Sequence, residues 1–200
     1  MVLIDRKYMP DGEAPSIKVL KRAFEIYLEQ RKRFIKLKKY YDGDHAISHR
    51  ELAGLDLPNN KLVCNHAEYI TNMATGYVFG TPIQYSGKGA EEINTLFTTI
   101  EEDSHNYNLG ENLSIYGAAL ELVYMDDDES PEPDLAEIEP VDGFVVCDTT
   151  VKHKPVFGVT FGPRIDLNGT FQGHDVVIYT KTREIPYFSE GATFSTFILD

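Results

Sequence analysis

The chain has 200 residues, a formal net charge of −13 and 42% hydrophobic residues. This length is enough for one domain or a compact two-lobed one with a buried core. No apolar run approaches the roughly 20 residues that a membrane-spanning helix needs, so a membrane protein is not expected. The first residues also lack the apolar core of a signal peptide, so secretion is not expected and the two cysteines are predicted to be reduced thiols.

The charge is unevenly distributed along the chain. Residues 1–50 hold 12 Lys/Arg against 7 Asp/Glu, a balance of +5, whereas the remaining 150 residues hold 7 against 25, a balance of −18. Because an acidic body repels phosphate, the composition argues against a chain that clamps nucleic acid over its whole surface.

A long helix is predicted from Ser16 to about Tyr40, after a flexible N-terminal arm over residues 1–15. Ser16 is a suitable N-cap, and apolar residues recur with helical spacing on one side. These residues are Ile17, Leu20, Phe24, Tyr27 and Leu28.

The second half of this helix, Arg31–Lys39, is strongly basic. One interpretation is a surface for an anionic partner or nucleic acid. The other is a solvated helix face whose cations interact favourably with the C-terminal end of the helix dipole. We favour the second because the aromatic residues among these charges occupy packing positions rather than exposed stacking positions.

The best-delimited segment of the chain is Asn59–Tyr85, which predicts a central helix over about residues 60–80. Asn59 or Asn60 is expected to cap the helix after Pro58, and Gly80 followed by Pro82 is expected to end it through a left-handed residue. Five apolar residues are spaced to share one face, and the segment is interpreted as a packing element. They are Val63, Ala67, Ile70, Met73 and Tyr77.

Two shorter helices are predicted over residues 90–102 and 107–122, and the character of the sequence then changes. Short β-branched or aromatic runs follow, separated by turn residues such as Asn168-Gly169. The predicted strands cover residues 122–125, 136–139, 144–147, 155–161, 176–180 and 194–199. The expected fold class is therefore α+β, with helices first and a mostly antiparallel sheet afterwards.

No pattern in the sequence makes a positive case for catalysis or for a metal. Asp126–Glu129 lacks the spacing of a calcium loop and is interpreted as a solvated hairpin loop. A GxSxG elbow and a glycine-rich phosphate loop are both absent. Four possible zinc ligands lack the usual spacing, so no catalytic, metal or cofactor site is assigned. They are His45, His49, Cys64 and His66.

Several motifs, taken in order, resemble the N-terminal part of tailed-phage portal proteins of the siphophage type. They are YYDGDHAI (residues 40–47), NNKLV (59–63), Asn65, GYVFGTPI (76–83), LSIYGAALELVY (113–124), IEP (138–140), FVVCD (144–148) and the strand over 155–161. Each motif is weak alone, and their order and spacing over residues 40–162 give the resemblance its specificity.

The resemblance implies a homo-oligomeric ring, normally of twelve subunits, at one vertex of the phage head in the virion, assembled in the host cytoplasm. Such portals nucleate head assembly, dock terminase, contact scaffold, capsid and head-completion proteins, and pass double-stranded DNA through a channel without reading its sequence. They have no catalytic residues and need no cofactor. The chain corresponds to the peripheral wing, with a helical part over residues 16–122 and a β-rich part over residues 123–200, and without stem, clip or crown.

Within the resemblance, a set of residues is expected to have structural roles. The asparagines and Lys61 are expected to cap or tie the first turn of the central helix, and the glycines and the proline to shape its packing and exit. His66 is expected to be a half-buried packing residue. The set comprises Asn59, Asn60, Lys61, Asn65, Gly76, Gly80, Pro82, Tyr116 and Gly117.

A second hypothesis stays open at this point. It is a phage protein that binds or processes DNA through the basic helix around Arg31–Lys39. An enzyme that uses the histidine and cysteine residues is a more distant third.

Overall fold

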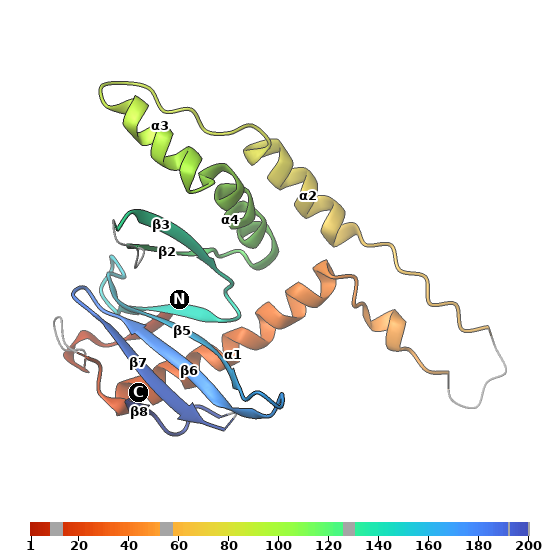
Figure 1. The fold of residues 1–200 in the computed structure, drawn as a ribbon. Coiled ribbons are helices and arrows are strands. Elements are labelled where there is room, and N and C mark those ends of the chain that lie inside the picture. Colours follow the sequence, from red (N-terminus) through yellow and green to blue (C-terminus); the bar gives the residue numbers. More distant parts are fainter. Residues whose placement is uncertain (9–13, 53–57, 126–130, 192, 200) are drawn as a thin grey trace. The chain divides into compact units, whose positions relative to one another are not determined.

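The computed structural model describes residues 1–8, 14–52, 58–125, 131–191 and 193–199, and helices precede most of the strands (Figure 1). The predicted α+β fold class is confirmed. The α-helices are α1 (Ile17–Tyr41), α2 (His66–Phe79), α3 (Ala90–Thr99) and α4 (Glu102–Tyr116), with short 3-10 helices η1 (Arg6–Tyr8) and η2 (Ala46–His49). The strands are β1 (Val2–Ile4), β2 (Leu120–Met125), β3 (Pro133–Ile138), β4 (Gly143–Asp148), β5 (Pro155–Ile165), β6 (Phe171–Tyr179), β7 (Glu184–Glu190) and β8 (Ile198–Leu199).

The chain divides into two compact units, and the division does not follow the expected boundary between residues 122 and 123. The first unit joins Met1–Lys32 to Pro140–Asp200, and the second comprises Arg33–Glu139. Helix α1 contributes its first part to one unit and its last part to the other. The strands β2 and β3 belong with the helices of the second unit rather than with the large sheet.

The first unit contains a six-stranded sheet in the order β1-β4-β5-β6-β7-β8. All pairs are antiparallel except β1 and β4, which run parallel with Val2 opposite Val146. The expectation of a loosely held arm over residues 1–15 is therefore wrong at its start. Val2 is fully buried because this short apolar strand completes the edge of the sheet. Residues 9–13 of the expected arm lie outside the described residues.

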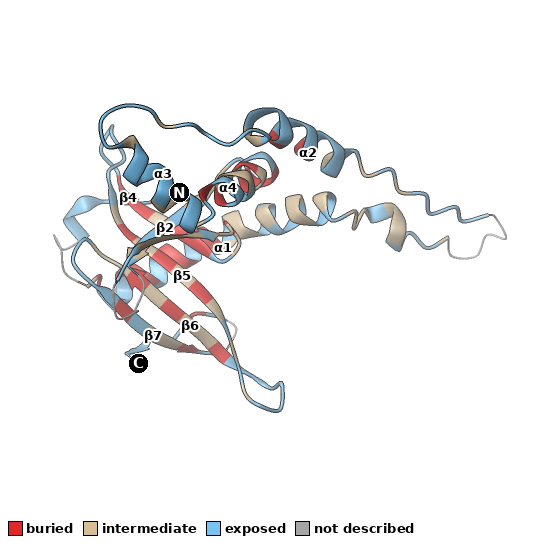
Figure 2. Ribbon diagram, turned by 45° about the horizontal axis from the view of Figure 1, so that its top comes forward, coloured by how far each residue is buried: buried red, intermediate tan, exposed pale blue. Residues whose placement is uncertain are grey.

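An aromatic cluster fills the core of the first unit, between the first part of α1 and the sheet. The ring of Phe24 stacks on Phe194 with centroids 4.3 Å apart and meets Phe144 edge-on at 5.2 Å. The buried hydroxyl of Tyr27 donates a hydrogen bond of 2.8 Å to the carbonyl oxygen of Pro140. Figure 2 shows buried residues of this sheet in strands β4–β6, and the buried residues of α1 all lie in its first part, between Val19 and Tyr27. The apolar side of α1 that the sequence predicts thus packs against this sheet through residues such as Leu20, Phe24 and Tyr27.

In the second unit, α4 is the central element. It contacts α2, α3 and strand β3, which pairs with β2 as a two-stranded antiparallel ribbon. The register places Val123 opposite Leu135 and Met125 opposite Pro133. Along β2 the side chains alternate between half-buried and exposed, as expected for a ribbon with one side to solvent.

The boundaries of the helices differ from several predictions. Helix α2 starts at His66 and is capped by Asn65, so the predicted caps Asn59 and Asn60 are wrong. Gly80 has φ −69°, an α conformation rather than the expected left-handed one. The last predicted helix starts at residue 102 instead of 107 and ends at Tyr116, because Gly117 adopts φ 72° and terminates it.

Two further observations complete the fold. Among the described residues, no helix combines the length and the apolar character that crossing a bilayer requires. The acidic segment Asp126–Glu129, interpreted as a hairpin loop, lies outside the described residues, which resume at Pro131.

Candidate functional site

Two of the four side chains considered as zinc ligands, His45 and His49, have local contacts. Nε2 of His45 lies 3.2 Å from the carbonyl oxygen of Tyr40, and His49 pairs with Asp44. Within the part of the chain that the structure describes, no group of three or more His, Cys, Asp or Glu side chains is placed to hold a metal ion. The two histidines instead hold the turn that follows α1.

In the first unit, the basic run that begins at Arg31 is engaged with acceptors. Nε of Arg31 donates a hydrogen bond of 2.6 Å to the carbonyl oxygen of Val141, and its guanidinium lies 3.6 Å from a carboxylate oxygen of Asp142. Lys32 forms an ion pair of 2.7 Å with Glu29 on the same helix. These cations are compensated within the chain.

In the second unit, half of the cations of α1 are also compensated. Lys38 lies 3.5 Å from Asp42, and Lys39 lies 3.4 Å from Asp44. Arg33 and Lys36 are exposed and have no hydrogen-bond or ion-pair partner among the described residues. In the second unit, the basic run therefore leaves two of its four cations, Arg33 and Lys36, free to meet an anionic partner.

The junction between α1 and α2 centres on Tyr41. Its hydroxyl donates a hydrogen bond of 2.5 Å to Oε1 of Glu111 on α4 and lies 3.3 Å from Oδ1 of Asn72 on α2. Burial and the hydrogen bond to Glu111 raise the pKa of the Tyr41 phenol. The phenol therefore stays protonated and connects three helices.

Asn65 reinforces the same junction. Its side-chain amide donates a hydrogen bond of 2.7 Å to the carbonyl oxygen of Tyr41, while its Oδ1 accepts one of 3.3 Å from the backbone N–H of Glu68. Asn65 is thus both the N-cap of α2 and a tie to the end of α1. The next residue, His66, is exposed rather than half-buried as expected.

Asn59 and Asn60 form hydrogen bonds with Arg50 instead of capping a helix. Nε of Arg50 donates a hydrogen bond of 3.1 Å to Oδ1 of Asn59, whose amide returns one of 2.9 Å to the carbonyl oxygen of Arg50. The Arg50 guanidinium also donates to the carbonyl oxygen of Asn60 at 3.2 Å. Lys61 is exposed and has no hydrogen-bond partner among the described residues.

The side of α2 that packs is not the one that the apolar pattern predicts. The buried residues are Thr71 and Thr75, and the Thr71 hydroxyl lies 3.4 Å from that of Ser114 on α4. The predicted face is instead open to solvent, with Ile70 and Met73 each 64% exposed and Tyr77 93% exposed. The prediction that the segment packs through this face is wrong within the chain.

Glycines shape the contact between α2 and α4, but at a different position from the expected one. A Cβ on Gly110 of α4 would lie 2.4 Å from ring carbons of Phe79, so the helices approach closely there. A Cβ on Gly76, by contrast, would meet nothing within 4 Å. The signal for Gly110 is a glycine in the middle of an otherwise helical pattern, which commonly has a packing reason.

Tyr116 and Gly117 close the other end of α4. The buried Tyr116 hydroxyl donates a hydrogen bond of 2.9 Å to Oε2 of Glu139, and its ring lies 5.9 Å from that of Phe34, nearly perpendicular to it. Gly117 supplies the left-handed residue that ends the helix. A Cβ there would meet nothing within 4 Å, so the role of Gly117 is its left-handed backbone and not a close contact.

Pro82 lines a cleft of about 430 Å³ between residues 82–85 and helices α3 and α4. Glu102 is buried there and accepts a hydrogen bond of 2.7 Å from the Tyr85 hydroxyl and another from Asn106. The hydrogen bond to Glu102 and burial raise the pKa of Tyr85. The buried carboxylate of Glu102 is thus satisfied by donors within the chain.

Sequence reasoning missed the residues that connect the elements, namely Tyr41, Arg50 and Glu111. Their partners lie between 9 and 70 positions away in the chain. The only local signal was the Tyr40-Tyr41-Asp42-Gly43 turn, which identified the end of a helix but not what the tyrosine hydroxyl would contact.

The arrangement is that of a scaffold: ties between helices and an exposed apolar helix face. Over residues 20–198 the chain matches the family model described as phage portal protein, SPP1 Gp6-like. Comparison with curated proteins gave no match.

The matched region covers most of the chain, so the protein belongs to the class of phage portal proteins. Within that class it is a member of the SPP1 Gp6-like family. The resemblance seen in the sequence motifs is thereby confirmed.

Proposed function

We propose that this chain is a structural subunit of the portal vertex of a phage head, acting in assembly and DNA passage rather than in catalysis. The observation that carries the proposal is the family match over residues 20–198. In this proposal the subunits form a closed ring, normally of twelve copies. Residues 16–200 build its peripheral wing. The order of the portal-like motifs from Tyr40 to Phe161 supports the wing assignment.

The proposed partners follow from that role. The ring would engage terminase, scaffold, capsid and head-completion proteins, and double-stranded DNA would pass through its channel. The net charge of −13 suits passage of DNA without adhesion, because an acidic surface repels phosphate. The proposed location is the portal vertex of the virion, after assembly in the host cytoplasm.

The experiment that tests this proposal is to produce the complete gene product that carries this chain and examine it by negative-stain microscopy and light scattering. We expect closed rings of uniform subunit number. A product that stays strictly monomeric in the presence of the head components would contradict the proposed function.

A gel-shift titration separates the portal role from DNA binding through the basic helix. Because most cations between Arg31 and Lys39 are compensated by acceptors in the chain, we expect weak binding that disappears by about 200 mM salt. Tight binding that persists at this salt concentration would favour the alternative.

A further inference from the structure

Four apolar side chains form one continuous exposed stripe on α2, which we name the α2 apolar face. At 3.6 residues per turn they lie within about 100° of one another around the helix, on the side opposite Thr71 and Thr75. Since these threonines are the buried residues of α2, the face points away from α4. The face consists of Tyr69, Ile70, Met73 and Tyr77, which are 63%, 64%, 64% and 93% exposed.

The size of this face indicates a protein contact. Side chains of this size each offer about 150–200 Å², so the four expose on the order of 500 Å². That equals the largest apolar patch on a typical monomer and is more than half of the roughly 800 Å² per partner in a standard interface. The face carries no charge, which makes it unsuited to nucleic acid.

A second, smaller apolar surface lies on the other side of α4. Helix α4 contacts both α2 and β3, so the β2–β3 ribbon and α2 are on different sides of the same unit (Figure 1). On β2, Val123 is 63% exposed and Met125 57% exposed, two positions apart and therefore on one side of the strand. Glu121 lies on the same side, at the end of the strand where its carboxylate is 2.9 Å from Nε2 of His105 on α4. We name Val123 and Met125 the β2 apolar row.

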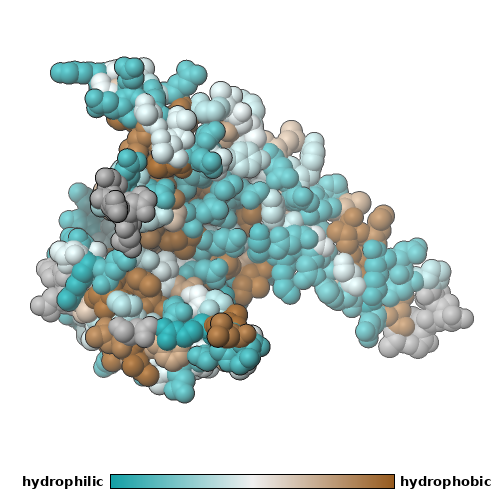
Figure 3. Space-filling model, viewed as in Figure 1, coloured by the Kyte–Doolittle hydropathy of each residue, from teal (hydrophilic) through white to brown (hydrophobic). Residues whose placement is uncertain are grey.

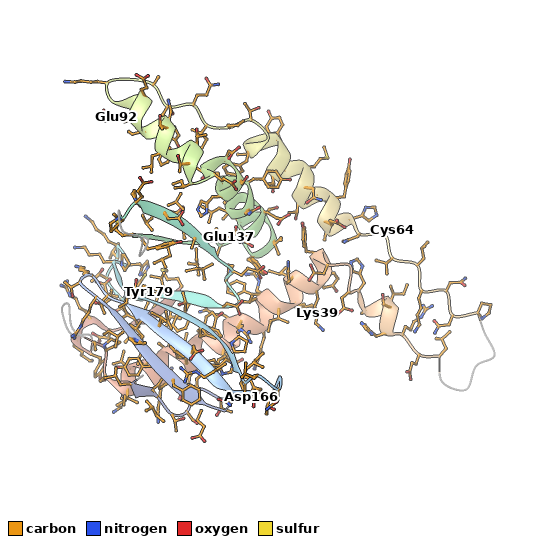
Figure 4. The ribbon with its side chains drawn as sticks, viewed as in Figure 1. Lys39, Cys64, Glu92, Glu137, Asp166 and Tyr179 are labelled. Atoms are coloured by element: carbon orange, nitrogen blue, oxygen red, sulfur yellow. The ribbon has the colours of Figure 1, made fainter. Side chains whose placement is uncertain are left out.

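The surroundings of the two surfaces carry opposite charge. The described residues of the β2–β3 ribbon and its flanks, 120–125 and 131–139, hold five carboxylates and no lysine or arginine. The end of α1 in the second unit instead offers Arg33 and Lys36, cations that are free among the described residues, since Lys38 and Lys39 are paired with Asp42 and Asp44. The cationic end of α1 is tied to the start of α2 through the hydrogen bond from Asn65 to Tyr41. Figure 4 shows Lys39 near the end of α1 and Cys64 just before α2, with Glu137 on β3.

We propose that the α2 apolar face of one subunit packs against the β2 apolar row of a second copy of this chain. Both surfaces are apolar and their surroundings carry opposite charge, so pairing of the unlike surfaces is favoured over pairing of like ones. Such a contact is heterologous, and repetition of a heterologous contact generates a ring when the rotation closes. The inference rests on the proposed portal function and assigns one contact between neighbouring subunits.

The test is disulfide cross-linking between copies in the complete gene product. In a Cys64→Ser background, which removes the exposed native thiol near α2, Tyr77→Cys and Val123→Cys are combined in one chain. Mild oxidation of the assembled protein is expected to give a ladder of covalent dimers, trimers and higher species on a non-reducing gel. A ladder arises because each subunit would then donate one cysteine to each neighbour.

Each single-cysteine variant is the matched control and is expected to remain monomeric on the same gel. Dimers from Tyr77→Cys alone would reveal a symmetric contact of α2 with α2 and overturn the proposal. Assembled rings without any ladder would overturn it too, while leaving the portal function intact. A wild-type protein that never assembles would contradict the contact and the portal function together.

A second variant tests the contact through assembly strength. Met73→Glu places a charge in the centre of the α2 apolar face and is expected to weaken assembly at least about tenfold, because the carboxylate would be buried. Leu167→Glu, at a fully exposed turn of the first unit, is the control and is expected to leave assembly unchanged. Circular dichroism of both variants verifies that the fold is retained. Equal assembly by Met73→Glu and wild type would overturn the proposal.

Discussion

Asn65 connects two helices through a single side chain. Its oxygen caps the first turn of α2, and its amide donates to the last turn of α1 at the carbonyl oxygen of Tyr41. The neighbouring Gly43 has φ 78°, and a Cβ there would lie 3.5 Å from the Asn65 amide nitrogen. The junction therefore depends on a left-handed glycine in the turn and on a residue that both donates and accepts.

We expect Asn65→Ala to lower the free energy of unfolding by about 1–2 kcal/mol, because it removes a cap and a half-buried hydrogen bond. Asn65→Asp keeps the cap acceptor but turns a carboxylate oxygen toward the carbonyl oxygen of Tyr41 and the carboxylate of Glu68, so its loss should be at least as large. Urea denaturation followed by circular dichroism measures both. An Asn65→Asp variant as stable as wild type would show that the cap alone, and not the tie, supplies the stability.

Asp148 is a second residue whose contacts determine a measurable property. Its Oδ1 accepts hydrogen bonds from the Thr150 hydroxyl at 2.5 Å, from the Thr150 backbone N–H at 3.1 Å and from that of Lys154 at 3.0 Å. The Thr150 hydroxyl, together with these backbone donors, lowers the pKa of the Asp148 carboxyl. The ionised carboxylate thus holds the turn between β4 and β5.

Because the folded-state pKa of Asp148 lies below its unfolded value, its contribution to stability is present at neutral pH and is lost as the pH falls through the folded-state pKa. We expect Asp148→Asn to be less stable than wild type at pH 7, and the difference to shrink on acidification below about pH 4. Urea denaturation at several pH values measures it. Glu184→Gln, at an exposed carboxylate of β7, serves as the control; a pH-independent difference for Asp148→Asn would refute this explanation.

At the scale of elements, the close contact between α2 and α4 requires a residue without a side chain at position 110, which is Gly110. Gly110→Ala would drive a methyl group into the Phe79 ring, and overpacking of this kind costs about 1–3 kcal/mol. The same change gains about 1 kcal/mol of helix propensity. We therefore expect Gly110→Ala to be neutral to destabilising in wild type but stabilising by up to about 1 kcal/mol in a Phe79→Ala background.

A double-mutant cycle of unfolding free energies measures this coupling between Gly110 and Phe79. Gly76→Ala is the matched control, since a Cβ at Gly76 meets nothing within 4 Å and should show the propensity gain alone in both backgrounds. Additive effects of Gly110→Ala and Phe79→Ala would mean that the two helices do not pack as closely as the structure shows.

Elements with strong local signals were predictable from the sequence. Helix α1 has a capping serine, a regular apolar spacing and a terminating glycine, and it was placed within one residue at each end. Strand β7 was missed because Pro186 interrupts its pattern, although it pairs with Val177 of β6. Strand β1 was missed because its three residues gain their partner only from β4, more than 140 positions later.

The candidate site was less predictable than the fold. Periodicity showed correctly that Ile70, Met73 and Tyr77 share a face of α2, but it cannot indicate what covers that face. Whether a helix face is buried depends on the element that packs against it. In this chain that element is α4, which contacts the side of α2 with Thr71 and Thr75. Among the described residues, no other element covers this face, which is why its apolar pattern misled the prediction.

At the scale of the whole molecule, apolar burial is divided very unequally between the two units. Among the described residues, only Ile115 and Tyr116 of the second unit belong to the buried apolar core. The remaining buried apolar residues lie in the first unit, where some apolar residues also reach the surface over the sheet (Figure 3). Because apolar burial is the main favourable term in folding, the second unit has the weaker core and gains most from a partner.

Hydrogen exchange measured by mass spectrometry on the monomeric and the assembled protein tests this division. We expect amides of β4–β6 to be strongly protected in both forms, because their strands lie in the buried core. Amides of α2 should exchange faster in the monomer and slow at least about tenfold on assembly, as a neighbouring subunit covers the α2 apolar face. The turn at residues 166–169 is the internal control and should not change. Unaltered exchange of α2 in assembled rings would show that the second unit is stabilised through a different surface.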